Sequence, residues 1–209
     1  YTELMASAAV RQALPALAAV SAEVGAAAIQ NRGTIGGNVC NASPAGDTLP
    51  ILLASDALFH LGGPRGERAV AADRFFVGYR KTALAADELL LRVEVPISGD
   101  RGEVVYRKVG TRRAQSISKT ILAVRARADG GTLAQVRIAA GCVAEVPLRC
   151  RQAEAAADGR PLLPETISAA CAALQADIRP IDDVRSDAEY RRRASAAVLG
   201  RLLEGFGRE

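Results

Sequence analysis

The spacing of apolar residues near the start of the chain predicts helix. Between residues 4 and 24, leucine and valine recur at intervals close to three and four, and the alanines between them favour helix. Pro15 lies inside this pattern. Because proline lacks the N–H group that a helix interior needs, we expect the helix to break or restart near it.

Residues 31–38 interrupt the apolar pattern. The stretch Asn-Arg-Gly-Thr-Ile-Gly-Gly-Asn is polar and rich in glycine, and glycine is unfavourable inside a helix, so we expect a loop at these positions. The loop is predicted to continue over residues 41–47, where Pro44 and Gly46 are typical turn residues. A short apolar run follows at residues 49–53.

Alternating and short apolar runs predict strands in both halves of the chain. We expect them at residues 57–61, 69–70, 89–95, 104–106, 121–128 and 133–142. Gly130-Gly131 is a plausible hairpin turn between the last two. The polar, glycine-containing link at residues 97–103 is the best candidate for a domain boundary.

Two helices are predicted after the last strand. One begins near Pro164, and the other begins at Ser186, where Ser-Asp-Ala-Glu matches a capping box. Strands followed by helices indicate an α+β fold. With the link as boundary, the sequence predicts one domain over residues 1–98 and another over residues 103–209.

Composition narrows the classes of function. The net charge is +4, but the 23 acidic residues are interspersed with the 27 basic ones, which argues against a nucleic-acid-binding surface. Four widely spaced cysteines and a single histidine argue against a zinc site or a disulfide framework. No apolar run approaches the roughly 20 residues that span a bilayer. We therefore expect a soluble cytoplasmic protein with reduced thiols and no metal site.

The glycine pair Gly36-Gly37 suggests a ligand-binding backbone. Without side chains, paired glycines let a ligand approach closely and leave N–H donors open, which suits diphosphate oxygens. Nearby hydrogen-bonding side chains are those of Thr34, Asn38, Asn41 and Asp47. The alternative is a tight turn capped by polar residues. The GxGxxG spacing of a Rossmann dinucleotide site is absent.

Three stretches of the sequence resemble motifs of one protein family, and they occur in the same order as in that family. They are NRGTIGGNVCNASPAGDTLP at residues 31–50, FFVGYRKTAL at 75–84 and YRKVGTRRAQSIS at 106–118. They are similar to the flavoprotein component of the molybdenum hydroxylases, which include xanthine dehydrogenase and carbon monoxide dehydrogenase. The resemblance implies the second lobe of a PCMH-type FAD-binding domain, followed by a small C-terminal domain with an antiparallel sheet and helices.

The resemblance also implies a cofactor site in this chain. Its residues would be Thr34, Ile35, Gly36, Gly37, Asn38, Asn41, Asp47, Leu90 and Lys108. Residues 34–38 would line the FAD diphosphate and ribityl region, and Asn41 and Asp47 would bind the ribityl chain or nearby flavin groups. Leu90 would meet the isoalloxazine ring. Lys108 would lie near its pyrimidine edge, where a cation favours the anionic reduced flavin.

The sequence departs from the family pattern in two places. The family has a second diphosphate loop, of the AGGTD type, in a first lobe ahead of residue 1, so we expect a fragment, a truncated chain or half of a split protein. Val24 or Gly25 stands where some xanthine dehydrogenases place an aromatic residue beside the flavin.

The implied function is electron transfer. FAD in this chain would take electrons from 2Fe-2S clusters and pass them to NAD, oxygen or a quinone. Molybdopterin and the clusters would lie in partner subunits, so no catalytic residue is assigned to this chain. The alternatives are a cofactor-free structural or assembly fragment and a nucleotide-binding regulator that uses the glycine loop.

Overall fold

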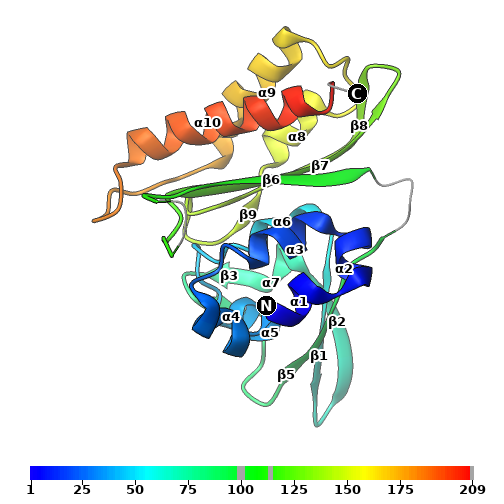
Figure 1. The fold of residues 1–209 in the computed structure, drawn as a ribbon, viewed down its shortest axis with the longest axis vertical. Helices are drawn as coiled ribbons and strands as arrows, with labels where there is room; N and C mark the ends of the chain where they lie inside the picture. The colour runs from blue at the N-terminus through cyan, green and yellow to red at the C-terminus, as the bar shows by residue number, and fades with distance from the viewer. Residues whose placement is uncertain (98–101, 113–114, 208–209) are drawn as a thin grey trace.

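A four-stranded antiparallel sheet crosses the middle of the molecule, with helices on both faces (Figure 1). The structure is a computed structural model that describes residues 1–97, 102–112 and 115–207. Most of the link predicted at residues 97–103 lies outside the described residues. The strands are ordered β6-β7-β8-β9 and span Glu103–Val109, Thr120–Asp129, Thr132–Gly141 and Leu148–Arg149. Gly130 and Gly131 both have positive φ in the turn between β7 and β8, which confirms the predicted hairpin.

The two faces of β7 belong to two different hydrophobic cores. Ile121 and Ala123 pack into the core of the first half of the chain, whereas Leu122 and Val124 pack into that of the second half. Successive side chains of a strand point to opposite faces. This is why residues 121–124 of β7 are all apolar rather than alternating, and both halves of the chain share one sheet.

Three helices cover one face of this sheet. They are α8 (Arg151–Ala157), α9 (Pro164–Asp177) and α10 (Ala188–Gly205). The start of α9 agrees with the prediction, but α8 was not predicted. The capping box at Ser186 was wrong by one residue, because Asp187 is the N-cap and its side chain accepts a hydrogen bond from the N–H of Tyr190 at 2.6 Å.

Short helices and two small sheets lie against the other face. The helices are α1 (Thr2–Ala6), α2 (Ala8–Ala13), α3 (Pro15–Ser21), α4 (Ala27–Arg32), α5 (Ile35–Asn41), α6 (Leu49–Ala54) and α7 (Ala72–Phe75). The helix break predicted near Pro15 is confirmed, since Pro15 begins α3, and a further break occurs at Ser7. The apolar run at residues 49–53 forms α6, which is fully buried.

The small sheets are also antiparallel. One has the order β2-β1-β5, formed by Gly66–Ala71, Leu58–Gly63 and Leu89–Glu94, and the other pairs β3 (Phe76–Gly78) with β4 (Lys81–Thr82). The three strands predicted in the first half are therefore present, and the α+β fold is confirmed.

One predicted loop was wrong. Residues 35–41 form α5, so Gly36 and Gly37 lie in the first turn of a helix. The helix tolerates them because Thr34 caps it: the Thr34 hydroxyl oxygen accepts a hydrogen bond from the Gly37 N–H at 2.9 Å. Neither glycine has a positive φ, so their role does not depend on left-handed backbone.

Candidate functional site

The first turn of α5 offers a bare stretch of backbone. Thr34 and Gly37 are exposed and Gly36 is partly exposed. Within the described residues, the N–H groups of Ile35 and Gly36 have no acceptor, as expected for the first positions of a helix. The Gly37 N–H is already taken by the Thr34 cap. The N–H groups open to a ligand are therefore those of Ile35 and Gly36, rather than those of the pair Gly36-Gly37.

Leu90 lies directly beside this turn. A Cβ atom built on Gly36 would meet the Leu90 Cδ2 atom at 3.8 Å, an ordinary van der Waals contact. Leu90 is in β5, which packs against α5. The structure thus brings together the glycine turn and a leucine that is 54 residues away in sequence.

The two asparagines of α5 have protein partners. The Asn38 side-chain oxygen accepts a hydrogen bond from the Thr48 hydroxyl at 2.7 Å, and that of Asn41 accepts one from Arg80 at 2.8 Å. These bonds occupy the oxygens and leave the amide N–H groups as the available donors.

Asp47 and Lys108 form a buried ion pair. Lys108 Nζ lies 2.6 Å from Asp47 Oδ2, and the two side chains are only 6% and 10% exposed. The Ser118 hydroxyl donates to Asp47 Oδ1 at 2.5 Å, so both carboxylate oxygens are occupied. Lys108 also donates to the backbone carbonyl of Glu23 at 3.0 Å. A lysine ammonium group has three N–H donors, which leaves one for a further acceptor.

Lys108 faces a hollow of about 970 Å³. The hollow is lined by residues from the turn before α4, from β6 and from the segment after it: Ala22, Glu23, Tyr106, Arg107, Lys108, Val109, Gly110, Arg112 and Ser116. The Tyr106 hydroxyl donates to Glu23 Oε1 at 2.8 Å, which fixes that wall. The volume is within the range of about 300–1,000 Å³ typical of small-molecule sites.

The Asp47 carboxylate affects several neighbouring groups. Burial and the charge of Asp47 together raise the pKa of Tyr1 to about 12, although a hydrogen bond with Thr48 acts in the opposite direction. Burial, followed by Asp47, raises the pKa of Cys142 to about 12. Burial, the hydrogen bond to Glu23 and the charge of Asp47 also raise the pKa of Tyr106. These three side chains are therefore neutral at physiological pH, and Lys108 supplies the cation beside Asp47.

Eight of the nine predicted site residues form two neighbouring groups with one connecting residue, and the ninth, Asn41, ends α5 and pairs with Arg80 instead. One consists of the first turn of α5 with Leu90, and the other of Asp47 with Lys108. Asn38 connects them, because its partner Thr48 is adjacent to Asp47. Sequence reasoning did not assign roles to Glu23, Tyr106 and Ser118. Tyr106 and Ser118 lie within one recognised stretch, but their partners are 83 and 71 residues away, and a single sequence carries no signal of such contacts.

No helix within the described residues is long and apolar enough to cross a membrane. The same part of the chain contains no cluster of three or more His, Cys, Asp or Glu residues that could hold a metal ion.

Two protein-family models match this chain. The model described as "FAD binding domain in molybdopterin dehydrogenase" matches residues 1–98. The model described as "CO dehydrogenase flavoprotein C-terminal domain" matches residues 105–206.

Curated proteins and solved structures are similar over nearly the whole chain. The putative xanthine dehydrogenase FAD-binding subunit of Escherichia coli K12 is 31% identical, over 91% of this chain and 66% of its own length. The carbon monoxide dehydrogenase medium chain of Hydrogenophaga pseudoflava is 32% identical, over 96% and 70%. A solved structure of carbon monoxide dehydrogenase from that organism aligns with a TM-score of 0.90 and 34% identity, covering 95% of this chain and 69% of the other. This chain therefore spans about two thirds of the length of these proteins.

Proposed function

This chain belongs to the FAD-binding medium subunits of the molybdenum hydroxylases, and from this premise we propose that it is the flavin-carrying electron-transfer component of such an enzyme. The observation that carries the proposal is the open first turn of α5 beside Leu90, close to a lysine that faces a large hollow. We further propose the division into a flavin domain over residues 1–98 and a C-terminal domain over residues 103–209.

The first turn of α5 would hold the diphosphate and ribityl part of FAD. The N–H groups of Ile35 and Gly36 are available as donors, and the absence of side chains at Gly36 and Gly37 lets phosphate oxygens reach them. Thr34 still has its hydroxyl proton to donate, although its oxygen caps the helix. The amide N–H groups of Asn38 and Asn41 would add donors at the same surface.

Leu90 and Lys108 would contact the ring system. Leu90 offers an apolar surface next to the glycine turn. The remaining N–H of Lys108 is the donor we assign to the pyrimidine edge of the flavin. Because Asp47 already balances the Lys108 charge, the pair presents a directed hydrogen bond rather than a full uncompensated cation. We infer that Asp47 and Ser118 position Lys108, and that Asp47 keeps lone pairs able to accept a hydrogen bond from a ribityl hydroxyl.

The chemistry supplied by bound FAD is the coupling of one-electron and two-electron carriers. The chain itself contributes binding groups and electrostatics, and we assign it no catalytic residue. We propose that electrons reach it from 2Fe-2S clusters and leave to NAD, oxygen or a quinone. The clusters and the molybdopterin would be held by partner subunits in a hetero-oligomeric complex. We place this complex in the cytoplasm, where the four free cysteines of the chain would stay reduced.

The proposal is tested by identifying the cofactor released from the full-length protein. The protein is purified with its natural partners, denatured with acid, and the released small molecules are identified by mass spectrometry. We expect FAD at about one molecule per chain. FMN, or no flavin at all, would contradict the proposal, and the second result would favour a cofactor-free structural fragment.

A further inference from the structure

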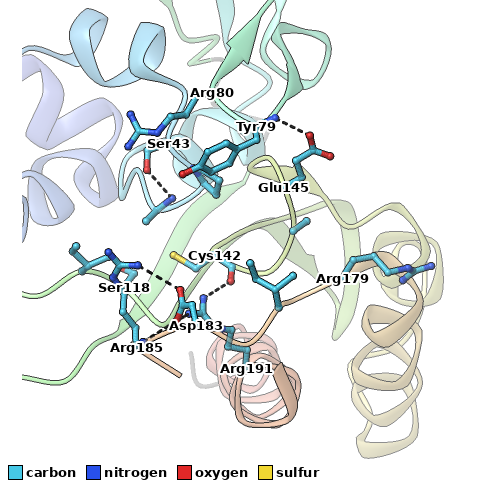
Figure 2. A pocket seen from close by; sticks show the side chains of 15 residues that line it. Ser43, Tyr79, Arg80, Ser118, Cys142, Glu145, Arg179, Asp183, Arg185 and Arg191 are labelled. Carbon is cyan, nitrogen blue, oxygen red and sulfur yellow. Dashed lines mark hydrogen bonds and ion pairs between the residues drawn. The ribbon is translucent and has the colours of Figure 1, made fainter. Parts of the chain in front are cut away.

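A hollow of about 640 Å³ between the two halves of the chain adjoins the candidate flavin site (Figure 2). Two residues of its wall bind residues of that site: Ser118 donates to Asp47 at 2.5 Å, and Arg80 donates to Asn41 at 2.8 Å. The hollow is therefore part of the same region. The apolar contact of the site, Leu90, comes from a different part of the fold, the sheet β2-β1-β5 (Figure 1).

Strand β5 contains an irregularity at Leu91. The pairing of β5 with β1 shifts by one residue between His60 and Leu61. On one side of this shift, Arg92 lies opposite His60. On the other side, Leu90 lies opposite Leu61, so that Leu91 is an extra residue between the two pairs. One extra residue in one of two paired antiparallel strands is a β-bulge.

The bulge decides which leucine of β5 faces inward. Successive residues of a regular strand alternate between its two faces. Val93 lies opposite the fully buried Phe59 and is therefore on the inner face. Regular alternation from Val93 would place Leu91 on the inner face and Leu90 on the outer one. In the structure, Leu90 packs against the core and Leu91 is 48% exposed. Leu90 thereby reaches the first turn of α5, where it contacts Gly36.

Two glycines of β1 accommodate the bulged strand. A Cβ atom on Gly62 would lie 2.5 Å from the Leu91 Cδ1 atom, so the extra leucine lies over a residue that has no side chain. A Cβ atom on Gly63 would lie 2.6 Å from the backbone oxygen of Asp87, just before β5. Glycine inside a strand allows such a close approach of another backbone.

Hydrogen bonds on the outer face hold the part of β5 that follows the bulge. Arg92 donates to Glu67 at 3.1 Å and to His60 Nδ1 at 2.9 Å. His60 Nε2 lies 2.8 Å from a carboxylate oxygen of Glu94. Because arginine has no acceptor, Nδ1 is the accepting nitrogen, and Nε2 carries the proton that His60 donates to Glu94. These bonds fix the pairing of residues 92–94 with β1.

The start of β5 is anchored separately, by Glu88. Both carboxylate oxygens of Glu88 accept hydrogen bonds from Arg68 of β2, each at 2.7 Å. The backbone N–H of Ala85 also donates to Glu88, at 2.9 Å, and the Glu88 side chain is only 7% exposed. A bidentate arginine–carboxylate pair is strongly directional. It therefore holds Glu88 on the same face of the sheet as Arg68.

The two anchors are one residue out of step. A shift of one residue turns every side chain of a strand to the opposite face. If the pairing of residues 92–94 continued unchanged to the start of β5, Glu88 would turn away from Arg68. The Glu88–Arg68 pair and the outer hydrogen bonds can form together only because Leu91 takes up the extra residue.

We propose that Glu88 is a positioning residue for the flavin. Through its pair with Arg68, it holds the start of β5 in the shifted register, and the resulting bulge turns Leu90 toward the isoalloxazine ring. This inference rests on the proposed function, since it takes Leu90 as a contact of that ring. Without the anchor, β5 can relax to regular alternation, in which Leu91 takes the place of Leu90.

The two leucines form a matched pair that tests the bulge. Leu90→Ala and Leu91→Ala are made in the full-length protein, which is purified with its natural partners. In Leu90→Ala, the dissociation constant of FAD should rise roughly tenfold, because part of a buried apolar contact is lost. The long-wavelength absorption band of the flavin should also shift. Leu91→Ala should match the parent in both respects. Equal effects of the two substitutions, or a larger effect of Leu91→Ala, would overturn the proposal.

Glu88→Ala tests the anchor, with Glu67→Ala as its control. Glu67 also pairs with an arginine of the same sheet, but on the outer face, where its side chain is 57% exposed. We expect Glu88→Ala to shift the flavin band as Leu90→Ala does, and Glu67→Ala to leave it unchanged. Glu88→Gln, which keeps an acceptor for Arg68, should restore most of the parent spectrum. In the Glu88→Ala background, Leu91→Ala should alter the band and Leu90→Ala should no longer do so.

The spectrum distinguishes positioning from a purely structural role. If Glu88 contributes only to stability, Glu88→Ala should lower the melting temperature while the bound flavin keeps the parent spectrum, and this result would overturn the proposal. Arg68→Met removes the same pair from a side chain that is 46% exposed, and it provides the test if Glu88→Ala does not fold. Absence of flavin from the parent protein would instead refute the proposed function, so the two failures are distinguishable.

Discussion

At Gly37, a side chain should affect cofactor binding and helix stability to different extents. The residue is exposed, and a Cβ atom there would meet the Thr34 hydroxyl oxygen at 3.0 Å. Helix α5 tolerates many residues in its first turn, so a side chain at this position costs little stability. The same side chain would cover the surface that we assign to the FAD diphosphate.

We therefore predict that Gly37→Val lowers FAD affinity far more than stability. Loss of one or two hydrogen bonds to a charged group corresponds to roughly ten- to hundredfold weaker binding. The free energy of unfolding should fall by only about 1 kcal/mol, because the Thr34 cap must shift. Flavin retention and melting temperature are measured on the same preparation. Gly205→Val is the control, since nothing lies within 4 Å of a Cβ atom there. Equal loss of flavin in both variants would show that Gly37 has no special role.

The second prediction concerns the contribution of the Asp47–Lys108 ion pair to the free energy of unfolding. Asp47→Asn leaves the buried Lys108 without its counter-charge, and Lys108→Met does the same to Asp47. Either change should lower the free energy of unfolding by about 3–5 kcal/mol, the cost of an unpaired buried charge. The double variant should recover part of that loss. Urea unfolding curves measure all three, and a double variant whose loss equals the sum of the two singles would argue against coupling.

At the scale of elements, the N-terminus of α10 allows a test of which residue caps the helix. The sequence pattern pointed to Ser186 as the N-cap of α10, but the Asp187 side chain makes the capping bond to Tyr190. Asp187→Ala should therefore cost about 1 kcal/mol of stability, and Ser186→Ala should cost almost nothing. Thermal unfolding distinguishes the two variants. A larger loss of stability in Ser186→Ala than in Asp187→Ala would indicate that Ser186 is the N-cap after all.

Periodicity predicted the longer strands and the last two helices, but it missed α5 and several short elements. Strands β1, β5, β7 and β8 were predicted because their apolar residues have strong local patterns. Helix α5 was missed because its glycines have poor helix propensity, and its stability comes from the Thr34 cap and from packing against β5. The site was likewise predicted only where its residues form a local pattern. Its glycine turn was visible as a motif, whereas the pairing of Lys108 with Asp47 spans 61 residues.

At the scale of the whole molecule, a cluster of charges links the two halves. Asp56, just after α6, pairs with Arg125 of β7 and with Arg149 of β9, each at 2.7 Å. Burial alone would raise the pKa of Asp56, but the hydrogen bond and charge of Arg125, with the charges of Arg149 and Arg137, hold it below its usual value of 3.8. The cluster joins the end of α6 to the sheet that both halves share, so it should affect the stability of both halves together.

A pH prediction follows from the direction of that shift. A carboxyl group whose pKa is lower in the folded state stabilises the fold above its unfolded pKa, and this stabilisation is lost as the pH falls through the folded value. At pH 7, Asp56→Asn should lower the free energy of unfolding by roughly 2 kcal/mol, the range for hydrogen bonds to charged groups. The difference between the variant and the parent should shrink as the pH falls below 3.8. Urea unfolding across that range is the measurement, and a difference that does not depend on pH would contradict this role of Asp56.

The most direct test of the central claim is the visible absorption spectrum of the full-length protein purified with its natural partners, before and after chemical reduction. If this chain carries FAD, the oxidised protein should show flavin bands at about 370 and 450 nm in addition to any iron–sulfur absorbance. The bands should bleach on reduction and should be weaker in the Gly37→Val variant than in Gly205→Val. A spectrum in which the flavin bands are missing, or in which they persist equally in both variants, would contradict FAD binding at the first turn of α5.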